Sequence, residues 1–221
     1  MTEFLRRIKS LNLSYPIFSY LLLNSPFLPP ATPHYYYTKE DKTRQERDMS
    51  HICYSLADLR RKGPNHYTYL YLDEKGLGDA EAVEVAQLLK GNTTITEVYL
   101  SGNQINDTGA AALGEAFKVN TTITTVYLNS NQISDRGAAA LGEAFKVNTT
   151  ITTVDLGVNQ ISDTGAAALG EAFKVNTTIT KVYLSYNNIT RLPAALAQNR
   201  TITDFDYYGN PIDYIPPSVE R

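Results

Sequence analysis

The sequence is poor in the residue types on which many classes of protein depend. Among its 221 residues there is one cysteine, Cys53, so an internal disulfide is excluded and a reducing compartment is favoured. The three histidines, His34, His51 and His66, all precede residue 67, and none has the cysteine or glutamate spacing of a zinc site. We therefore predict a protein without enzymatic activity, metal or cofactor.

Long hydrophobic runs are also missing. No run approaches the roughly 20 apolar residues that a membrane-spanning helix needs. The apolar patch at residues 17–23 follows Arg6, Arg7 and Lys9, an order that resembles a secretion signal. Glu3 lies within that basic region, however, and no small-residue cleavage site follows the patch. We expect a cytoplasmic protein, with secretion as the alternative.

The net charge is small, but the basic and acidic residues are unevenly distributed along the chain. The formal net charge is −3, with ten basic and six acidic residues up to position 66 and ten basic and seventeen acidic residues after it. An acidic body repels the phosphate backbone. We therefore expect no nucleic-acid partner.

What the sequence does contain is one 28-residue unit that occurs three times, at residues 98–125, 126–153 and 154–181. A fixed period of this length predicts a stack in which each unit buries its apolar face against its neighbours. Within each unit an alternating segment predicts a short strand, and an Ala- and Leu-containing segment predicts a helix with one apolar stripe.

Two further residues of the unit carry local predictions. Gly114 lies in the middle of a predicted helix, where glycine costs about 1 kcal/mol relative to alanine. Its recurrence therefore predicts a close approach between helix and strand. Asn120 follows the helix and fits a left-handed helix stop.

The unit resembles the leucine-rich repeat, because Ile95, Val98, Leu100, Asn103 and Ile105 recur with that spacing. Its length and full helix resemble the ribonuclease-inhibitor-like subclass. The resemblance covers residues 67–221 and implies an α/β solenoid, a horseshoe arc with about six parallel strands on a concave face and helices on the convex side. The repeat units are then 70–97, 98–125, 126–153, 154–181, 182–204 and 205–221, the last including a C-terminal cap.

The residues before the repeats divide into two segments. Residues 1–38 form an N-terminal extension that lacks a clear pattern. Residues 39–66 have a charged, helical pattern and predict an N-terminal helical cap over the first repeat. The apolar stripe of this helix consists of Met49, Ile52, Cys53, Leu56 and Leu59.

One asparagine in each unit follows the strand at a fixed position. A buried amide can supply both a donor and an acceptor to backbone groups inside a stack. We predict that these residues form a structural ladder: Asn103, Asn131, Asn159, Asn187 and Asn210.

Only six of the 28 columns differ among the three similar units, and most of them lie on or just beyond the outward face of the strand. Repeat proteins generally bind partners on that face. Aromatic ladders that merely stabilise the sheet are the alternative interpretation. The predicted partner-binding residues of the concave face are Tyr69, Tyr71, Asp73, Glu97, Tyr99, Tyr127, Asn129, Asp155, Lys181, Tyr183, Asp206 and Tyr208.

We therefore predict a non-enzymatic, monomeric module that binds a protein partner carrying a basic or aromatic patch. The short regular repeats also resemble the leucine-rich-repeat effectors of intracellular bacterial pathogens, which implies delivery into a host-cell cytosol. The alternative function is regulation of a small GTPase, since some activating proteins resemble this subclass. Arg136, Arg191 and Arg200 are then the candidates for insertion into a nucleotide site.

Overall fold

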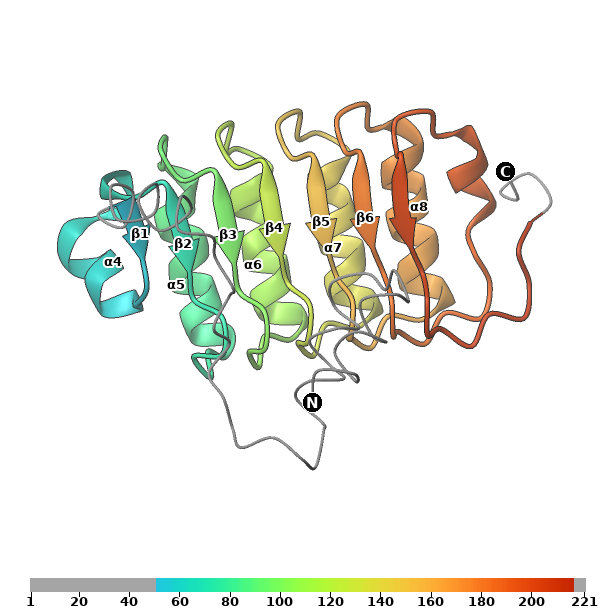
Figure 1. The fold of residues 1–221 in the computed structure, drawn as a ribbon, viewed down its shortest axis with the longest axis horizontal. Coiled ribbons are helices and arrows are strands. Elements are labelled where there is room, and N and C mark those ends of the chain that lie inside the picture. Colours follow the sequence, from blue (N-terminus) through green and yellow to red (C-terminus); the bar gives the residue numbers. More distant parts are fainter. Residues whose placement is uncertain (1–50, 217–221) are drawn as a thin grey trace, which may run out of the picture. The chain divides into compact units, whose positions relative to one another are not determined.

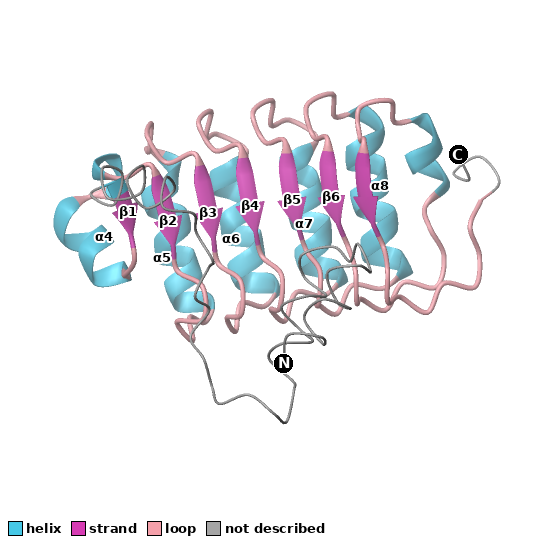
Figure 2. Ribbon diagram, in the orientation of Figure 1, coloured by secondary structure: helices cyan, strands magenta, loops and turns pink. Residues whose placement is uncertain are grey.

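A computed structural model describes residues 51–216 of the chain, and its strands lie side by side in one sheet (Figure 1). This part of the chain contains seven parallel strands in chain order, from β1 to β7. In the described residues, the four long helices lie on one face of the sheet, and the short helix that follows β1 lies at the end of the sheet beside that strand (Figure 2). The strands are β1 (Ile52–Cys53), β2 (Tyr69–Tyr71), β3 (Glu97–Tyr99), β4 (Thr125–Tyr127), β5 (Thr153–Asp155), β6 (Lys181–Tyr183) and β7 (Asp204–Asp206).

The four long helices alternate with the strands, as the 28-residue period predicts. They are α5 (Asp79–Lys90), α6 (Asp107–Phe117), α7 (Asp135–Phe145) and α8 (Asp163–Val175). The shorter elements are α4 (Leu56–Lys62), η2 (Pro64–His66) and η3 (Ala194–Gln198). The turn at η3 replaces a full helix because Leu192-Pro193 stands where the earlier units have their glycine-led helix start.

The core consists of the same columns in every unit. Val98 and Leu100 point inward from the strand, while Leu113 and Phe117 point inward from the helix, and all four are fully buried. Equivalent side chains stack from unit to unit, as Phe145 does on Phe173 with ring centroids 6.3 Å apart. The predicted stacked α/β repeat fold is confirmed, with seven strands in the described residues rather than about six.

The seventh strand corrects the prediction for the N-terminal cap. Ile52 and Cys53 pair in parallel with Tyr69 and Leu70, and the helix begins only at Leu56. A continuous helix up to Lys62 is therefore wrong for the described residues, and residues 39–50 lie outside them. The cap instead continues the sheet by one short strand and covers the first unit with a helix of two turns.

The asparagines predicted to form a ladder occupy the turn that follows each strand. In the central unit, Asn131 Oδ1 accepts a hydrogen bond from the Ile105 backbone N–H at 3.0 Å. Its Nδ2 donates to the carbonyls of Leu100 and Leu128 at 2.9 and 3.1 Å. Each amide thus joins its own unit to the preceding one and pairs backbone groups that water cannot reach.

A second ladder of asparagines lies at the other end of the unit, where the helix returns to the strand. Asn120 Nδ2 donates to the carbonyls of Leu89 and Asn92, and Asn120 Oδ1 accepts from the Ile123 backbone N–H. The φ angle of Asn120 is not positive, so the predicted left-handed helix stop is wrong. The side chains of this ladder are Asn92, Asn120, Asn148, Asn176 and Asn199.

A third ladder is made of the aspartates at the helix starts. Asp107 Oδ1 accepts from the backbone N–H groups of Ser134 and Gly137 in the next unit, at 2.8 and 2.9 Å. A Cβ atom on Gly137 would lie 2.7 Å from that oxygen, which explains the Asp-x-Gly sequence. The members are Asp79, Asp107, Asp135 and Asp163.

The glycine inside each helix serves helix–helix packing. A Cβ atom on Gly114 would lie 3.0 Å from the carbonyl oxygen of Ala140, which belongs to the neighbouring helix α7. The prediction of a close helix–strand approach is therefore wrong. The small residue instead lets adjacent convex helices lie close together.

The first testable prediction concerns the strand-side ladder. Asn131→Ala leaves the buried Ile105 backbone N–H without its acceptor and removes one of the two amide donors to each of the Leu100 and Leu128 carbonyls. An unpaired buried group costs on the order of 1–3 kcal/mol. Asn210→Ala, at the half-buried end of the stack, should lower the free energy of unfolding by less. Denaturation with urea measures both changes. Equal destabilisation of the two variants would contradict a ladder whose energetic value depends on burial.

Candidate functional site

The sheet face opposite the helices, which we name the concave face, consists of three columns set by the strand register. The first contains Tyr69, Glu97, Thr125, Thr153, Lys181 and Asp204. The second contains Tyr71, Tyr99, Tyr127, Asp155, Tyr183 and Asp206. The third follows two residues later and contains Asp73, Ser101, Asn129, Gly157, Ser185 and Tyr208.

Tyrosine rings stack along the first half of the second column. The ring centroids of Tyr71 and Tyr99 are 4.9 Å apart, and those of Tyr99 and Tyr127 are 4.8 Å apart with an interplanar angle of 22°. Tyr54, which follows β1, extends the row with its centroid 6.0 Å from that of Tyr71. Sequence reasoning missed Tyr54, because its rung belongs to a strand predicted as helix.

Two of the tyrosine hydroxyls are held by carboxylates of the first column. Tyr99 donates to Glu97 Oε2, and Tyr183 donates to Asp204 Oδ2 at 2.6 Å. Burial raises the pKa of both phenols, and the neighbouring carboxylates raise it further. These rings therefore stay neutral near pH 7 and present fixed aromatic surfaces rather than acid–base groups.

The stack is interrupted at β5, where Asp155 takes the place of a tyrosine. Its side chain was predicted to lie open on the concave face, but the residue is only 7% exposed. By register it lies between Tyr127 and Tyr183, two large side chains that leave it little access to water. Its Oδ1 accepts from the Gly157 backbone N–H at 2.9 Å.

Burial raises the pKa of Asp155 to about 6, and the negative charge of Asp206 adds to the increase. The pKa of Asp73 is raised to about 6 as well, again chiefly by burial, although its Oδ1 accepts from the Ser101 backbone N–H at 2.6 Å. Next to it, the Ser101 hydroxyl donates to Asn129 Oδ1. In the third column, Asp73, Ser101 and Asn129 are thus joined by hydrogen bonds, and the column continues with Gly157, Ser185 and Tyr208.

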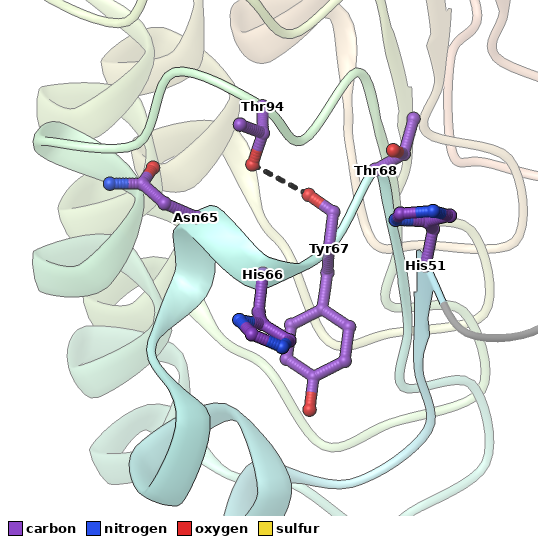
Figure 3. A pocket seen from close by; sticks show the side chains of 6 residues that line it. All are labelled: His51, Asn65, His66, Tyr67, Thr68 and Thr94. Carbon is purple, nitrogen blue, oxygen red and sulfur yellow. Dashed lines mark hydrogen bonds between the residues drawn. The ribbon is translucent and has the colours of Figure 1, made fainter.

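A separate pocket of about 490 Å³ lies at the N-terminal end of the described chain (Figure 3). It is lined by His51, Asn65, His66, Tyr67, Thr68 and Thr94. Thr94 Oγ1 donates to the Tyr67 carbonyl at 2.7 Å, which joins the first full unit to the cap. None of the predicted concave-face residues lines this pocket.

The residue types most often found in metal sites are dispersed in the described part of the chain. Within them, no three His, Cys, Asp or Glu side chains gather to hold a metal ion. Cys53 is buried, its thiol donates to the Ser55 carbonyl, and burial raises its pKa. Across residues 51–216, no helix is long and apolar enough to cross a membrane.

Comparison with known proteins gives the same fold. Residues 91–114, 119–142, 147–170 and 175–191 match the leucine-rich repeat family model. No curated protein matches the chain. The repeats are therefore leucine-rich repeats, and the described residues fold as an α/β leucine-rich-repeat solenoid.

Solved structures with a similar fold include leiomodin-1 actin-binding site 2, with a TM-score of 0.53 and 23% sequence identity over 57% of this chain and 74% of that one. They also include an internalin (inlF) from Listeria monocytogenes, with a TM-score of 0.40 and 20% identity over 64% of this chain. This chain spans 41% of that internalin's length. Leucine-rich-repeat domains generally mediate protein–protein interaction.

The second testable prediction follows from the raised pKa of Asp155. Between about pH 4 and 6 the unfolded carboxyl is ionised while the native one holds its proton, so native stability falls as pH rises through this window and levels off above it. An asparagine at this position would keep the acceptor for Gly157 without the charge. Asp155→Asn should therefore be more stable than the parent chain at pH 7 and nearly equal to it at pH 4.

Urea denaturation at both pH values checks this prediction. Asp206→Asn is the matched control, because Asp206 occupies the same column and is less buried than Asp155. The control should show a smaller gain in stability at pH 7. An Asp155→Asn chain that is less stable than the parent at pH 7 would contradict burial as the dominant influence on Asp155.

Proposed function

We propose that the concave face binds a protein partner through its tyrosine row and its acidic residues. The observation that supports this most is the pattern of change among the three similar units. The residues of the three hydrogen-bond ladders are the same in all three, while Tyr127 gives way to Asp155, Asn129 to Gly157 and Thr153 to Lys181. Change is thus concentrated on side chains that the core does not need.

The tyrosine row suits a protein interface for physical reasons. Stacking and the Tyr99–Glu97 contact fix the rings before a partner arrives, so little side-chain entropy is lost on binding. Aromatic residues are frequent at the energetic centres of interfaces. A sheet-stabilising ladder alone would not require the break at Asp155, where a carboxylate replaces a ring in a buried position.

The acidic side chains indicate the charge of the partner. Asp155, Asp204 and Asp206 lie on β5 and β7, and Lys181 on β6 is the cation among them. A partner with a basic patch would be attracted to this end of the face.

The 28-residue period with a full helix further supports assignment to the ribonuclease-inhibitor-like subclass.

The third testable prediction is that Tyr99→Ala/Tyr127→Ala abolishes partner capture. Both side chains point away from the core, so the free energy of unfolding should change by at most about 1 kcal/mol for each cross-strand pair that the substitutions remove. Binding should weaken by about 2 kcal/mol or more if these rings are central to the interface. Pull-down followed by calorimetry with the captured partner measures the change in affinity.

The matched control is the convex variant Glu143→Ala/Lys146→Ala, which removes an exposed ion pair between residues three apart. It should bind as the parent does. Asp155→Lys should slow association with a basic partner and weaken its dependence on salt. If the convex variant loses the partner and the tyrosine variant keeps it, the assignment to the concave face fails.

The alternative, regulation of a small GTPase, depends on the three candidate arginines. Arg191 lies over the Tyr214 ring at 5.0 Å, and Arg200 donates to the Ala197 carbonyl. Arg136 is exposed at the start of α7 and is the residue to test. Nucleotide hydrolysis across a GTPase panel, with the parent chain and Arg136→Ala, separates this function from simple partner binding.

A further inference from the structure

The turn that follows the third column adopts the same left-handed backbone conformation in every unit. The residues there have φ between 52° and 75°: Glu74, Gly102, Ser130, Val158, Tyr186 and Gly209. Glycine adopts this conformation without strain, whereas a β-branched residue such as valine does so rarely. Glu74, Val158 and Tyr186 are therefore the positions in this turn where a large side chain is kept against the preference of the backbone, and Val158 and Tyr186 are the β-branched and the aromatic residue among them.

Burial does not compensate for this strain. The exposed fraction is 44% for Val158 and 37% for Tyr186, and the nearby Tyr208 is 61% exposed. The unit at residues 98–125 has Gly102 in place of Val158, although the two units are otherwise nearly identical. Backbone strain held at exposed positions is characteristic of functional sites.

These three side chains lie on successive rungs at one edge of the concave face. The backbone N–H of Val158 donates to the Ser185 carbonyl at 2.7 Å, and that of Tyr186 donates to the Tyr208 carbonyl at 2.8 Å. The rings of Tyr186 and Tyr208 meet edge to face, with centroids 5.7 Å apart. We name Val158, Tyr186 and Tyr208 the rim cluster.

The ring of Tyr186 is also held by the backbone beside it. A Cβ atom on Gly209 would lie 2.5 Å from Tyr186 Cδ1, so the ring rests directly on the Gly209 backbone. The turn position is thus a glycine at residue 209, where a side chain would clash with the Tyr186 ring, and a larger residue at Val158 and Tyr186, whose side chains belong to the rim cluster. The cluster is a preformed apolar surface rather than a set of unrelated exposed residues.

The carboxylates next to the rim cluster indicate which side chains of a partner are complementary to it. Asp155 precedes Val158 by three residues, and Asp206 precedes Tyr208 by two and accepts from its backbone N–H at 2.9 Å. Asp204 lies on the same strand as Asp206, and Lys181 is the cation beside them. An apolar anchor bordered by carboxylates is complementary to an apolar residue bordered by cations.

We propose that the rim cluster receives a large aliphatic or aromatic side chain from an extended segment of the partner, with Arg or Lys within three residues of that side chain and facing Asp204 and Asp206. This inference rests on the proposed function and specifies the partner's recognition segment. The tyrosine row then contacts the remainder of the same segment or the surface around it.

The test uses the full chain and a displayed library of random twelve-residue peptides as the probe. Enriched peptides should contain a large apolar residue within three positions of Arg or Lys. Fluorescence anisotropy with the best peptide should show at least tenfold weaker binding to Tyr186→Ser/Tyr208→Ser and to Val158→Gly. The convex variant Glu143→Ala/Lys146→Ala should bind the peptide as the parent does.

Val158→Gly gives a second readout that a structural role would not produce. Glycine adopts the left-handed conformation without strain, so the thermal midpoint of unfolding of the Val158→Gly variant should rise while its affinity for the peptide falls. A residue needed only for folding would instead lower the midpoint when replaced.

Several outcomes would overturn the inference. These are no enrichment, enrichment without the apolar–basic pattern, or unchanged affinity in the rim variants. If Tyr99→Ala/Tyr127→Ala loses the peptide while the rim variants keep it, the rim inference fails and the proposed function stands. If neither set of variants affects binding, both fail. Dimerisation that Tyr186→Ser removes, seen by sedimentation, would overturn the inference by assigning the rim to a second copy of the chain.

Discussion

The buried asparagine amide that follows each strand is the contact on which the solenoid depends. A strand of three residues pairs few backbone groups, and the chain then turns away inside the stack, where carbonyls and N–H groups have no water. The Asn131 side chain supplies one acceptor and a forked donor to backbone groups of its own unit and the preceding one. Because an asparagine occupies the same position in each of these turns, the backbone groups of neighbouring units pair with the amides in the same register throughout the stack.

The other two ladders extend this principle to the remaining turns. Asn120 closes the return from helix to strand, and Asp107 ties the start of one helix to the start of the next. Hydrogen bonds from Ser134 and Gly137 overcome the effect of burial and hold the pKa of Asp107 below its usual value. The backbone is thereby fixed by a small set of repeated residues, and the concave side chains are left to vary.

Periodicity explains which parts of this structure the sequence predicts. The strands, the helices and the position of Asn131 follow from the repetition of one unit, since the pattern is observed three times. The strand at Ile52–Cys53 is harder to predict, because two residues fit a helical stripe and a strand equally well and only pairing with Tyr69 and Leu70 decides between them.

The burial of Asp155 could not be predicted for a related reason. Its exposure is set by Tyr127 and Tyr183 on the adjacent strands, and strand alternation gives the direction of a side chain without the size of its neighbours. The left-handed turn at Val158 was equally hidden, because among the three similar units only one has glycine there. The buried Asp155 carboxyl and the left-handed turn at Val158 both lie on the face where the units differ. At these two positions the residue present is not the one that would make the fold most stable.

This division between fixed ladders and varied surface can be tested by making one unit match another. The substitutions Asp155→Tyr, Val158→Gly and Lys181→Thr give the unit at residues 154–181 the residues of the unit at residues 98–125 at these three positions, and they leave all three ladders intact. Calorimetric titration with the partner captured by the parent chain is the decisive measurement. We predict that the triple variant unfolds cooperatively, at a temperature no lower than the parent, and no longer binds. A triple variant that binds with the parent's affinity, or that fails to fold, would contradict this division.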